Sequence, residues 1–163
     1  NFTKTAESMG DKDLTAWLNN YCDRMAKQVI KHGGTLDKFI GDAVMVFFGD
    51  PHSKGEKEDA IGCVRMALEM IQEVEDMNIQ IRVGLNSGPA YVGNFGTQQQ
   101  MNYTIIGNAV NLASRLEHSS EPGKILVSQA TYELVKDDFW CEERGPIKVK
   151  GLENDVMTYW VNA

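Results

Sequence analysis

Residues 35–49 read TLDKFIGDAVMVFFG, and this stretch decides the fold. Two runs rich in β-branched and aromatic residues lie on either side of the pair Gly41-Asp42. Apolar runs separated by a two-residue turn that contains glycine are typical of a β-hairpin. The stretch therefore predicts two antiparallel strands, at 35–40 and 43–48, with Asp42 at the turn.

Helical patterns lie on both sides of this hairpin. Apolar residues recur at intervals of three and four from Asp11 to His32, and Gly33-Gly34 is a typical helix stop. A second apolar stripe follows the polar segment 51–58, and its members are Ile61, Val64, Leu68, Ile71 and Val74. The hairpin is therefore expected between two amphipathic helices.

The rest of the chain alternates between strand-like and helix-like patterns. Helices are predicted at 108–117 and 129–136, and strands at 79–85, 90–95, 101–106, 125–127, 139–143, 147–150 and 156–161. The sequence contains no internal repeat, linker or low-complexity stretch. This order predicts a single α+β domain over residues 1–163, with a mainly antiparallel sheet backed by helices.

Composition excludes several classes of function. The 163-residue chain carries a formal charge of −7, which argues against a nucleic-acid partner, because such a partner needs a basic face. No apolar run approaches the roughly 20 residues of a membrane-spanning helix, and the first residues show no export signal. A cytoplasmic location is expected. The spacing of Cys22, Cys63 and Cys141 indicates free thiols in a reducing compartment. The histidines His32, His52 and His118 do not have the spacing of a metal site.

Three features carry candidate chemistry, and each also has a purely structural interpretation. Asp42 offers carboxylate oxygens suited to Mg²⁺, but acidic residues are also common in turns. Asn111 and Arg115 share one helical face and suit a ribose and a phosphoryl oxygen, or else simply face solvent. Lys148 and Lys150 share one face of a predicted strand, as phosphate contacts or as protection of a sheet edge.

Together, these motifs resemble the catalytic domains of class III nucleotidyl cyclases, in particular bacterial-type adenylyl cyclases. Residues 39–49 resemble the metal-binding hairpin of that family, and residues 82–88 its following strand and turn. Residues 107–115 resemble the entry of its signature helix, and residues 149–151 with Tyr159 its C-terminal strands. The resemblance runs from Asn1 to Val161. It implies a ferredoxin-like, βαββαβ-derived cyclase fold that acts as a dimer.

The resemblance also implies the chemistry and the residues that perform it. The expected reaction converts ATP to 3′,5′-cyclic AMP and pyrophosphate with two divalent ions, Mg²⁺ or Mn²⁺. Lys38 and Thr104 match the base-reading positions, where guanylyl cyclases typically carry Glu at the first. The other matched positions are Asp42 for the metals, Asn111 for the ribose, Arg115 for the transition state, and Lys150, Phe2 and Thr3 for the phosphates.

The resemblance further implies a homodimer with sites at the subunit interface, because one chain carries residues that the family draws from two subunits. Family members place a strand and a second metal-binding Asp just before the position of Asn1, so an upstream segment is expected. Attached regulatory domains in a longer protein are also expected. Two alternatives stay open: a non-catalytic, nucleotide-binding regulatory module, and a guanylyl cyclase.

Overall fold

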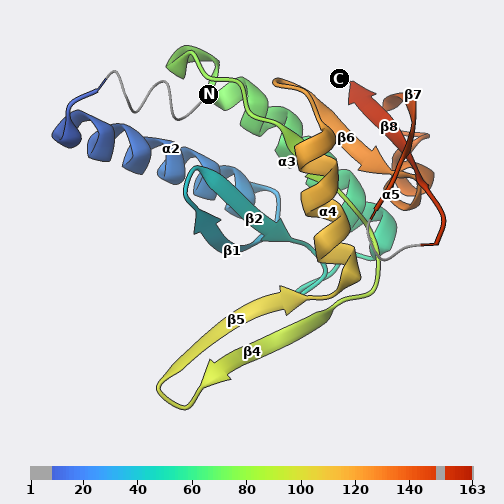
Figure 1. Ribbon diagram of the computed structural model, residues 1–163, viewed down its shortest axis with the longest axis horizontal. Coiled ribbons are helices and arrows are strands. Elements are labelled where there is room, and N and C mark those ends of the chain that lie inside the picture. Colours follow the sequence, from blue (N-terminus) through green and yellow to red (C-terminus); the bar gives the residue numbers. More distant parts are fainter. Residues whose placement is uncertain (1–8, 150–152, 163) are drawn as a thin grey trace.

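The computed structural model describes residues 9–149 and 153–162, and it combines helices with three β-sheets (Figure 1). The first half contains α2 (Asp11–Lys31), β1 (Thr35–Ile40), β2 (Ala43–Phe47), α3 (Glu56–Glu73), the 3₁₀ turn η1 (Glu75–Met77) and β3 (Val83–Leu85). The second half contains β4 (Tyr91–Thr97), β5 (Gln100–Ile106), α4 (Asn108–Ser119), β6 (Ile125–Ser128), α5 (Gln129–Val135), β7 (Trp140–Ile147) and β8 (Val156–Asn162).

The largest sheet has four strands in the order β3-β6-β8-β7. Strands β3 and β6 are parallel, whereas β6–β8 and β7–β8 are antiparallel. The pairs β1–β2 and β4–β5 form separate antiparallel hairpins. The predicted α+β class, with mainly antiparallel strands flanked by helices, is therefore confirmed.

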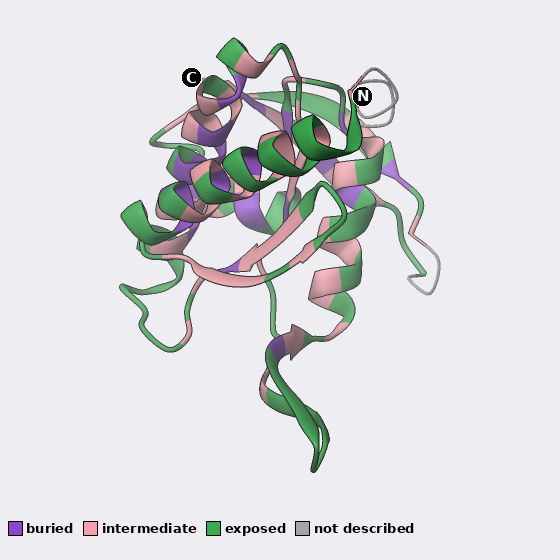
Figure 2. Cartoon of the chain, turned by 90° about the vertical axis from the view of Figure 1, so that its left-hand side faces the viewer, coloured by how far each residue is buried: buried purple, intermediate pink, exposed green. Residues whose placement is uncertain are grey.

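Helix α3 lies at the centre of the core because two of its faces are apolar. One face packs on the four-stranded sheet, where Val64 meets Ile125 and Val127. The other face packs on α2, where Met66 and Met70 join a cluster with fully buried Met25. Full burial of such a side chain contributes roughly 1.5–3 kcal/mol. Figure 2 shows this buried centre, and the hairpin β4–β5 projecting from it with mostly exposed residues.

Two strand predictions were wrong in their extent. The strand expected at 79–85 shrinks to Val83–Leu85, because Ile79 and Ile81 instead pack against the α2–α3 cluster. The strands expected at 139–143 and 147–150 are replaced by one strand, β7, that contains Gly145 and Pro146. Strand β7 lies at the edge of its sheet, where a residue without a backbone N–H is tolerated.

The C-terminal lysines lie beyond the end of strand β7 or outside the described residues. Strand β7 ends at Ile147, so Lys148 lies in no strand. The argument from strand alternation therefore fails for Lys148, whereas Lys150 lies outside the described residues. Among the described residues, no helix is both long enough and apolar enough to cross a membrane.

Candidate functional site

The turn between β1 and β2 presents an exposed carboxylate. Ile40 pairs with Ala43, which leaves Gly41 and Asp42 as a two-residue turn. Gly41 has a φ of +62°, a conformation that glycine adopts without steric penalty. Asp42 is exposed, and within the described part of the chain no hydrogen bond or ion pair occupies its carboxylate. The predicted hairpin, with Asp42 at its turn, is confirmed.

A β-bulge in β1 sets the direction of the side chains that precede this turn. Leu36 pairs with Val46 and Lys38 with Met45, so Asp37 is an extra residue without a partner in the ladder. Bulges of this kind redirect side chains that would otherwise alternate between the two faces. The Asp37 side chain is only 1% exposed, so the bulge directs it into the protein.

The Asp37 carboxylate joins the two hairpins. Its Oδ2 atom accepts a hydrogen bond from the Thr104 hydroxyl at 2.6 Å and another from the Ile105 backbone N–H at 3.2 Å. Its Oδ1 atom lies 3.5 Å from the Lys38 ammonium nitrogen, whose side chain is 47% exposed. The structure therefore brings Lys38 and Thr104 to the same carboxylate. Sequence reasoning did not identify Asp37, although an acidic residue beside a candidate base-reading lysine was a usable signal.

Asn111 and Arg115 lie on exposed positions of α4, one turn apart. Leu116, which is fully buried, fixes the opposite face of this helix. Gly84 of β3 allows a close approach, because a Cβ atom there would lie 2.1 Å from the backbone nitrogen of Glu117. Within residues 9–149 and 153–162 no hydrogen bond or ion pair engages the Arg115 guanidinium. Its donors are therefore available to a ligand.

The first turn of α4 is also held by hydrogen bonds. The Asn86 side-chain amide donates to the carbonyl of Ala109 at 3.0 Å. The Ser128 hydroxyl, at the end of β6, donates to the Asn86 Oδ1 atom at 2.6 Å. These bonds fix the helix to the four-stranded sheet, so the positions of Asn111 and Arg115 are set by the core.

Asp42 does not join this group within one chain. In Figure 1 the turn of the β1–β2 hairpin lies at the end of the hairpin that points away from α4. Among the described residues, no hydrogen bond or ion pair links Asp42 with Asn111 or Arg115, and no cluster of three or more His, Cys, Asp or Glu residues is placed to hold a metal. Phe2, Thr3 and Lys150 lie outside the described residues.

The cysteines are not candidate nucleophiles. Burial raises the pKa of the Cys63 thiol to about 12, and it also raises the pKa values of Cys22 and Cys141. Nucleophilic cysteines need the opposite shift, since the thiolate is the reactive form. The prediction of free thiols is confirmed, because all three cysteines are unpaired.

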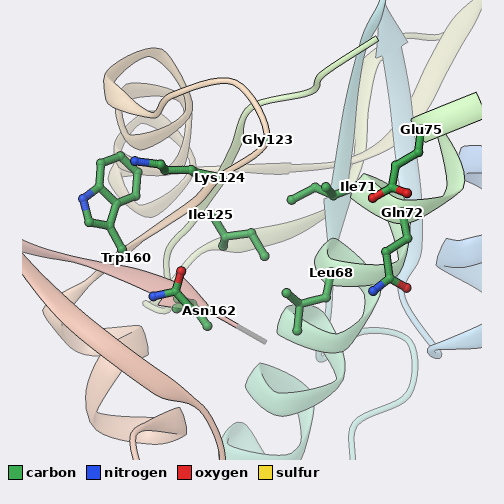
Figure 3. A pocket seen from close by; sticks show the side chains of 10 residues that line it. Leu68, Ile71, Gln72, Glu75, Gly123, Lys124, Ile125, Trp160 and Asn162 are labelled. Atoms are coloured by element: carbon green, nitrogen blue, oxygen red, sulfur yellow. The ribbon is translucent and has the colours of Figure 1, made fainter. Parts of the chain in front are cut away.

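A separate shallow pocket lies between the end of α3, the start of β6 and the end of β8 (Figure 3). Its lining includes Trp160, with the Lys124 ammonium 4.9 Å from the ring centroid. None of the predicted site residues that the structure describes lines it, so this pocket and the group around Asp37 are distinct.

Comparison with known proteins finds similarity to cyclase catalytic domains in both sequence and structure. Residues 1–163 match the family model described as the adenylate and guanylate cyclase catalytic domain. The chain is 35% identical, over 98% of its length, to the terminal-differentiation-specific adenylate cyclase of Dictyostelium discoideum. The chain spans from 8% to 36% of the length of the first curated relatives that it matches.

Solved structures of both kinds of cyclase share the fold. The adenylyl cyclase CyaB from P. aeruginosa is 46% identical, with a TM-score of 0.96 over 99% of this chain and 88% of that chain. The guanylate cyclase domain of RhGC from Catenaria anguillulae, in complex with GTP, is 30% identical, with a TM-score of 0.88 over 100% of this chain and 91% of that chain.

Proposed function

Because the chain belongs to the family of class III adenylyl and guanylyl cyclase catalytic domains, we propose that it converts ATP to 3′,5′-cyclic AMP and pyrophosphate. The observation that carries the choice of ATP is the meeting of Lys38 and Thr104 at one carboxylate. Because both side chains contact this carboxylate, we infer that they can contact one edge of a single base. The chain is 46% identical to the adenylyl cyclase CyaB and 30% identical to the guanylate cyclase domain of RhGC, and this difference supports the same choice.

The chemistry of the two purines explains why this pair favours adenine. Adenine presents an amino donor at C6 and an unprotonated nitrogen acceptor at N1, whereas guanine presents a carbonyl acceptor at C6 and an N–H donor at N1. A lysine ammonium only donates hydrogen bonds, and a threonine hydroxyl also accepts them. Lys38 facing N1 and Thr104 facing the C6 amino group would therefore match adenine and mismatch guanine.

Asn111 and Arg115 are proposed to act on the ribose and on the reacting phosphate. The reaction forms a bond between the ribose 3′ oxygen and the α-phosphorus, breaks the bond from that phosphorus to the bridging oxygen, and releases pyrophosphate. Asn111 would orient the ribose by hydrogen bonds. Arg115, which has no hydrogen-bond or ion-pair partner among the described residues, would donate to phosphoryl oxygens that gain negative charge, which stabilises the transition state.

Asp42 is the proposed metal ligand. Its carboxylate is exposed and makes no ion pair within residues 9–149 and 153–162, and oxygen ligands of this kind suit Mg²⁺ or Mn²⁺ shared with substrate phosphates. Bound divalent ions would lower the pKa of the attacking hydroxyl and would neutralise negative charge on the phosphates. A second carboxylate ligand would complete such a two-ion site.

A homodimer with sites between the subunits is proposed on two grounds. The Asp42 turn points away from α4 in a single chain, so a complete site needs a second copy (Figure 1). The projecting β4–β5 hairpin also exposes large apolar side chains suited to a protein contact, namely Tyr91, Phe95, Met101, Tyr103 and Ile106. The relatives are longer than this chain, and regulatory domains elsewhere in the protein are proposed to control it.

The test is to measure cyclic AMP, cyclic GMP and pyrophosphate formed from ATP or GTP, with Mg²⁺ and with Mn²⁺. Arg115→Ala is expected to lower kcat with ATP about 10²–10³-fold, which is typical for loss of one preorganised charge-stabilising group. Arg65→Ala, at an exposed position of α3, is the matched control and should keep wild-type activity. Nucleotide binding without any product would favour the regulatory-module alternative, and a preference for GTP would favour a guanylyl cyclase.

A further inference from the structure

We propose that Asp37 is a positioning residue that makes the site selective for adenine, by holding the Thr104 hydroxyl as a hydrogen-bond acceptor toward the base. This inference rests on the proposed cyclase function and adds a residue to it. Asp37 would not touch the nucleotide. It would act through Thr104 and Lys38, the two side chains that its carboxylate contacts.

The polarity of the Thr104 hydroxyl follows from its partner. A hydroxyl has one hydrogen to donate and two lone pairs that accept. A carboxylate only accepts, so at 2.6 Å the hydrogen of Thr104 must point to Asp37 Oδ2. What remains for a ligand is the lone pairs. Thr104 in this state matches a base that presents an amino group, and it repels one that presents a carbonyl oxygen.

Without this partner the hydroxyl would not discriminate. A free threonine hydroxyl rotates to suit its neighbour, so it would donate to a guanine carbonyl as readily as it would accept from an adenine amino group. The residue Thr104 is only 7% exposed, and the side chain of Asp37 is only 1% exposed. Water therefore competes little for either group. Selectivity is therefore attributed to the pair rather than to Thr104 alone.

The backbone supports this orientation from two sides. The Ile105 N–H also donates to Oδ2, at 3.2 Å, which fixes the carboxylate against β5. The bulge in β1 places Asp37 next to Lys38 without the strict alternation of a regular strand. The Lys38 ammonium lies 3.5 Å from Oδ1 and is half exposed, so it is held near Thr104 while it keeps donors free for a ligand.

A purely structural role for Asp37, as a tie between the two hairpins, is the competing interpretation. It predicts that removing Asp37 lowers stability but leaves the preference between bases unchanged. Base preference is therefore the deciding measurement. We would use binding of 3′-deoxy-ATP and 3′-deoxy-GTP with Mn²⁺, because these analogues lack the attacking hydroxyl and report selectivity without turnover.

In the wild-type protein 3′-deoxy-ATP should bind more tightly than 3′-deoxy-GTP. Asp37→Ala is expected to lower this preference about tenfold, the size of effect associated with one hydrogen bond. Thr104→Val, which keeps the volume of the side chain, should lower it similarly. Combining the two should add little to either alone, because both remove the same interaction. Asp37→Asn, whose amide offers Thr104 either a donor or an acceptor, should also lower the preference if Asp37→Ala does not fold.

Asp59→Ala is the matched control. Asp59 accepts from the Ser53 hydroxyl and from the Lys54 backbone N–H at 3.0 Å, the same pair of donor types that Asp37 uses. This variant should keep the wild-type preference. The proposal is overturned if folded Asp37 variants keep the wild-type ratio of affinities, or if the wild-type protein shows no preference. ATP turnover by the wild-type protein tests the cyclase function separately, so either idea can fail without the other.

Discussion

At the scale of single residues, burial gives the three thiols different reactivities. The Cys63 thiol has its pKa raised to about 12, the only thiol for which burial produces so large a shift. Because the thiolate is the nucleophile, Cys63 should react most slowly with a disulfide reagent at neutral pH. Measuring the rate of reaction with this reagent in the wild type and in the three single Cys→Ser variants would assign each kinetic phase to one thiol. A slow phase that persists in Cys63→Ser, or equal rates for all thiols in the folded protein, would contradict this order.

Tyr21 predicts a dependence of stability on alkaline pH. Burial, with a smaller contribution from the charge of Asp42, raises the pKa of Tyr21 to about 12. An unfolded tyrosine has a pKa of about 10, so above that pH the unfolded chain loses the proton first. The stability linked to this proton is complete below pH 10 and is lost as the pH rises toward 12. The loss is roughly 2–3 kcal/mol.

Urea unfolding from pH 9 to 11.5 would measure this effect, with Tyr21→Phe as the comparison. The variant should lose less stability than the wild type over the same range, since it lacks the titrating hydroxyl. Identical slopes would mean that Tyr21 ionises normally in the folded protein.

At the scale of elements, the contact between β3 and α4 depends on one glycine. A Cβ at Gly84 would lie 2.1 Å from the Glu117 nitrogen and 2.6 Å from the Ala113 carbonyl oxygen, both backbone atoms of α4. Gly84→Ala must therefore displace the helix that carries Asn111 and Arg115. The free energy of unfolding should fall by about 3 kcal/mol, at the upper end of overpacking effects.

Gly93→Ala is the control for this prediction, because a Cβ there meets only the Phe95 ring, at 3.8 Å. Its stability should stay within about 1 kcal/mol of the wild type. Chemical denaturation measures both changes, and cyclase turnover of the Gly84 variant should drop with the displaced helix. Equal stability of the two variants would show that α4 does not rest on β3 as described.

Elements fixed by local sequence were predictable, and elements fixed by distant contacts were not. The β1–β2 hairpin and α4 follow from a glycine turn and from apolar spacing, so both were found. Asp37 was missed because its role depends on a bulge and on a hydrogen bond to Thr104, 67 residues away. The division of β7 into two strands failed because Gly145-Pro146 looks like a boundary, whereas an edge strand accepts it.

At the scale of the whole molecule, the proposed division of the site between two copies predicts complementation. Asp42→Ala and Arg115→Ala should each retain about 1% of wild-type activity or less, since every site of either homodimer lacks one essential group. Mixed in equal amounts with subunit exchange, they should recover about a quarter of wild-type activity. Half of the dimers would be mixed, and each would carry one intact site of two. Activity no higher than the sum of the separate variants would exclude shared sites.

The buried carboxylate of Asp37 also constrains how nucleotide preference can evolve. A lineage that replaces Thr104 first leaves this carboxylate with one donor fewer in a dry environment, at a cost of about 1–3 kcal/mol. A lineage that replaces Asp37 first keeps a threonine able to contact either base. Both paths leave buried polar groups unpaired, because loss of Asp37 also removes the acceptor of the Thr104 hydroxyl and of the Ile105 N–H. The path through position 37 differs because it passes through a bifunctional ancestor that still carries Thr104. Laboratory selection for GTP use should accordingly enrich substitutions at position 37 before those at position 104.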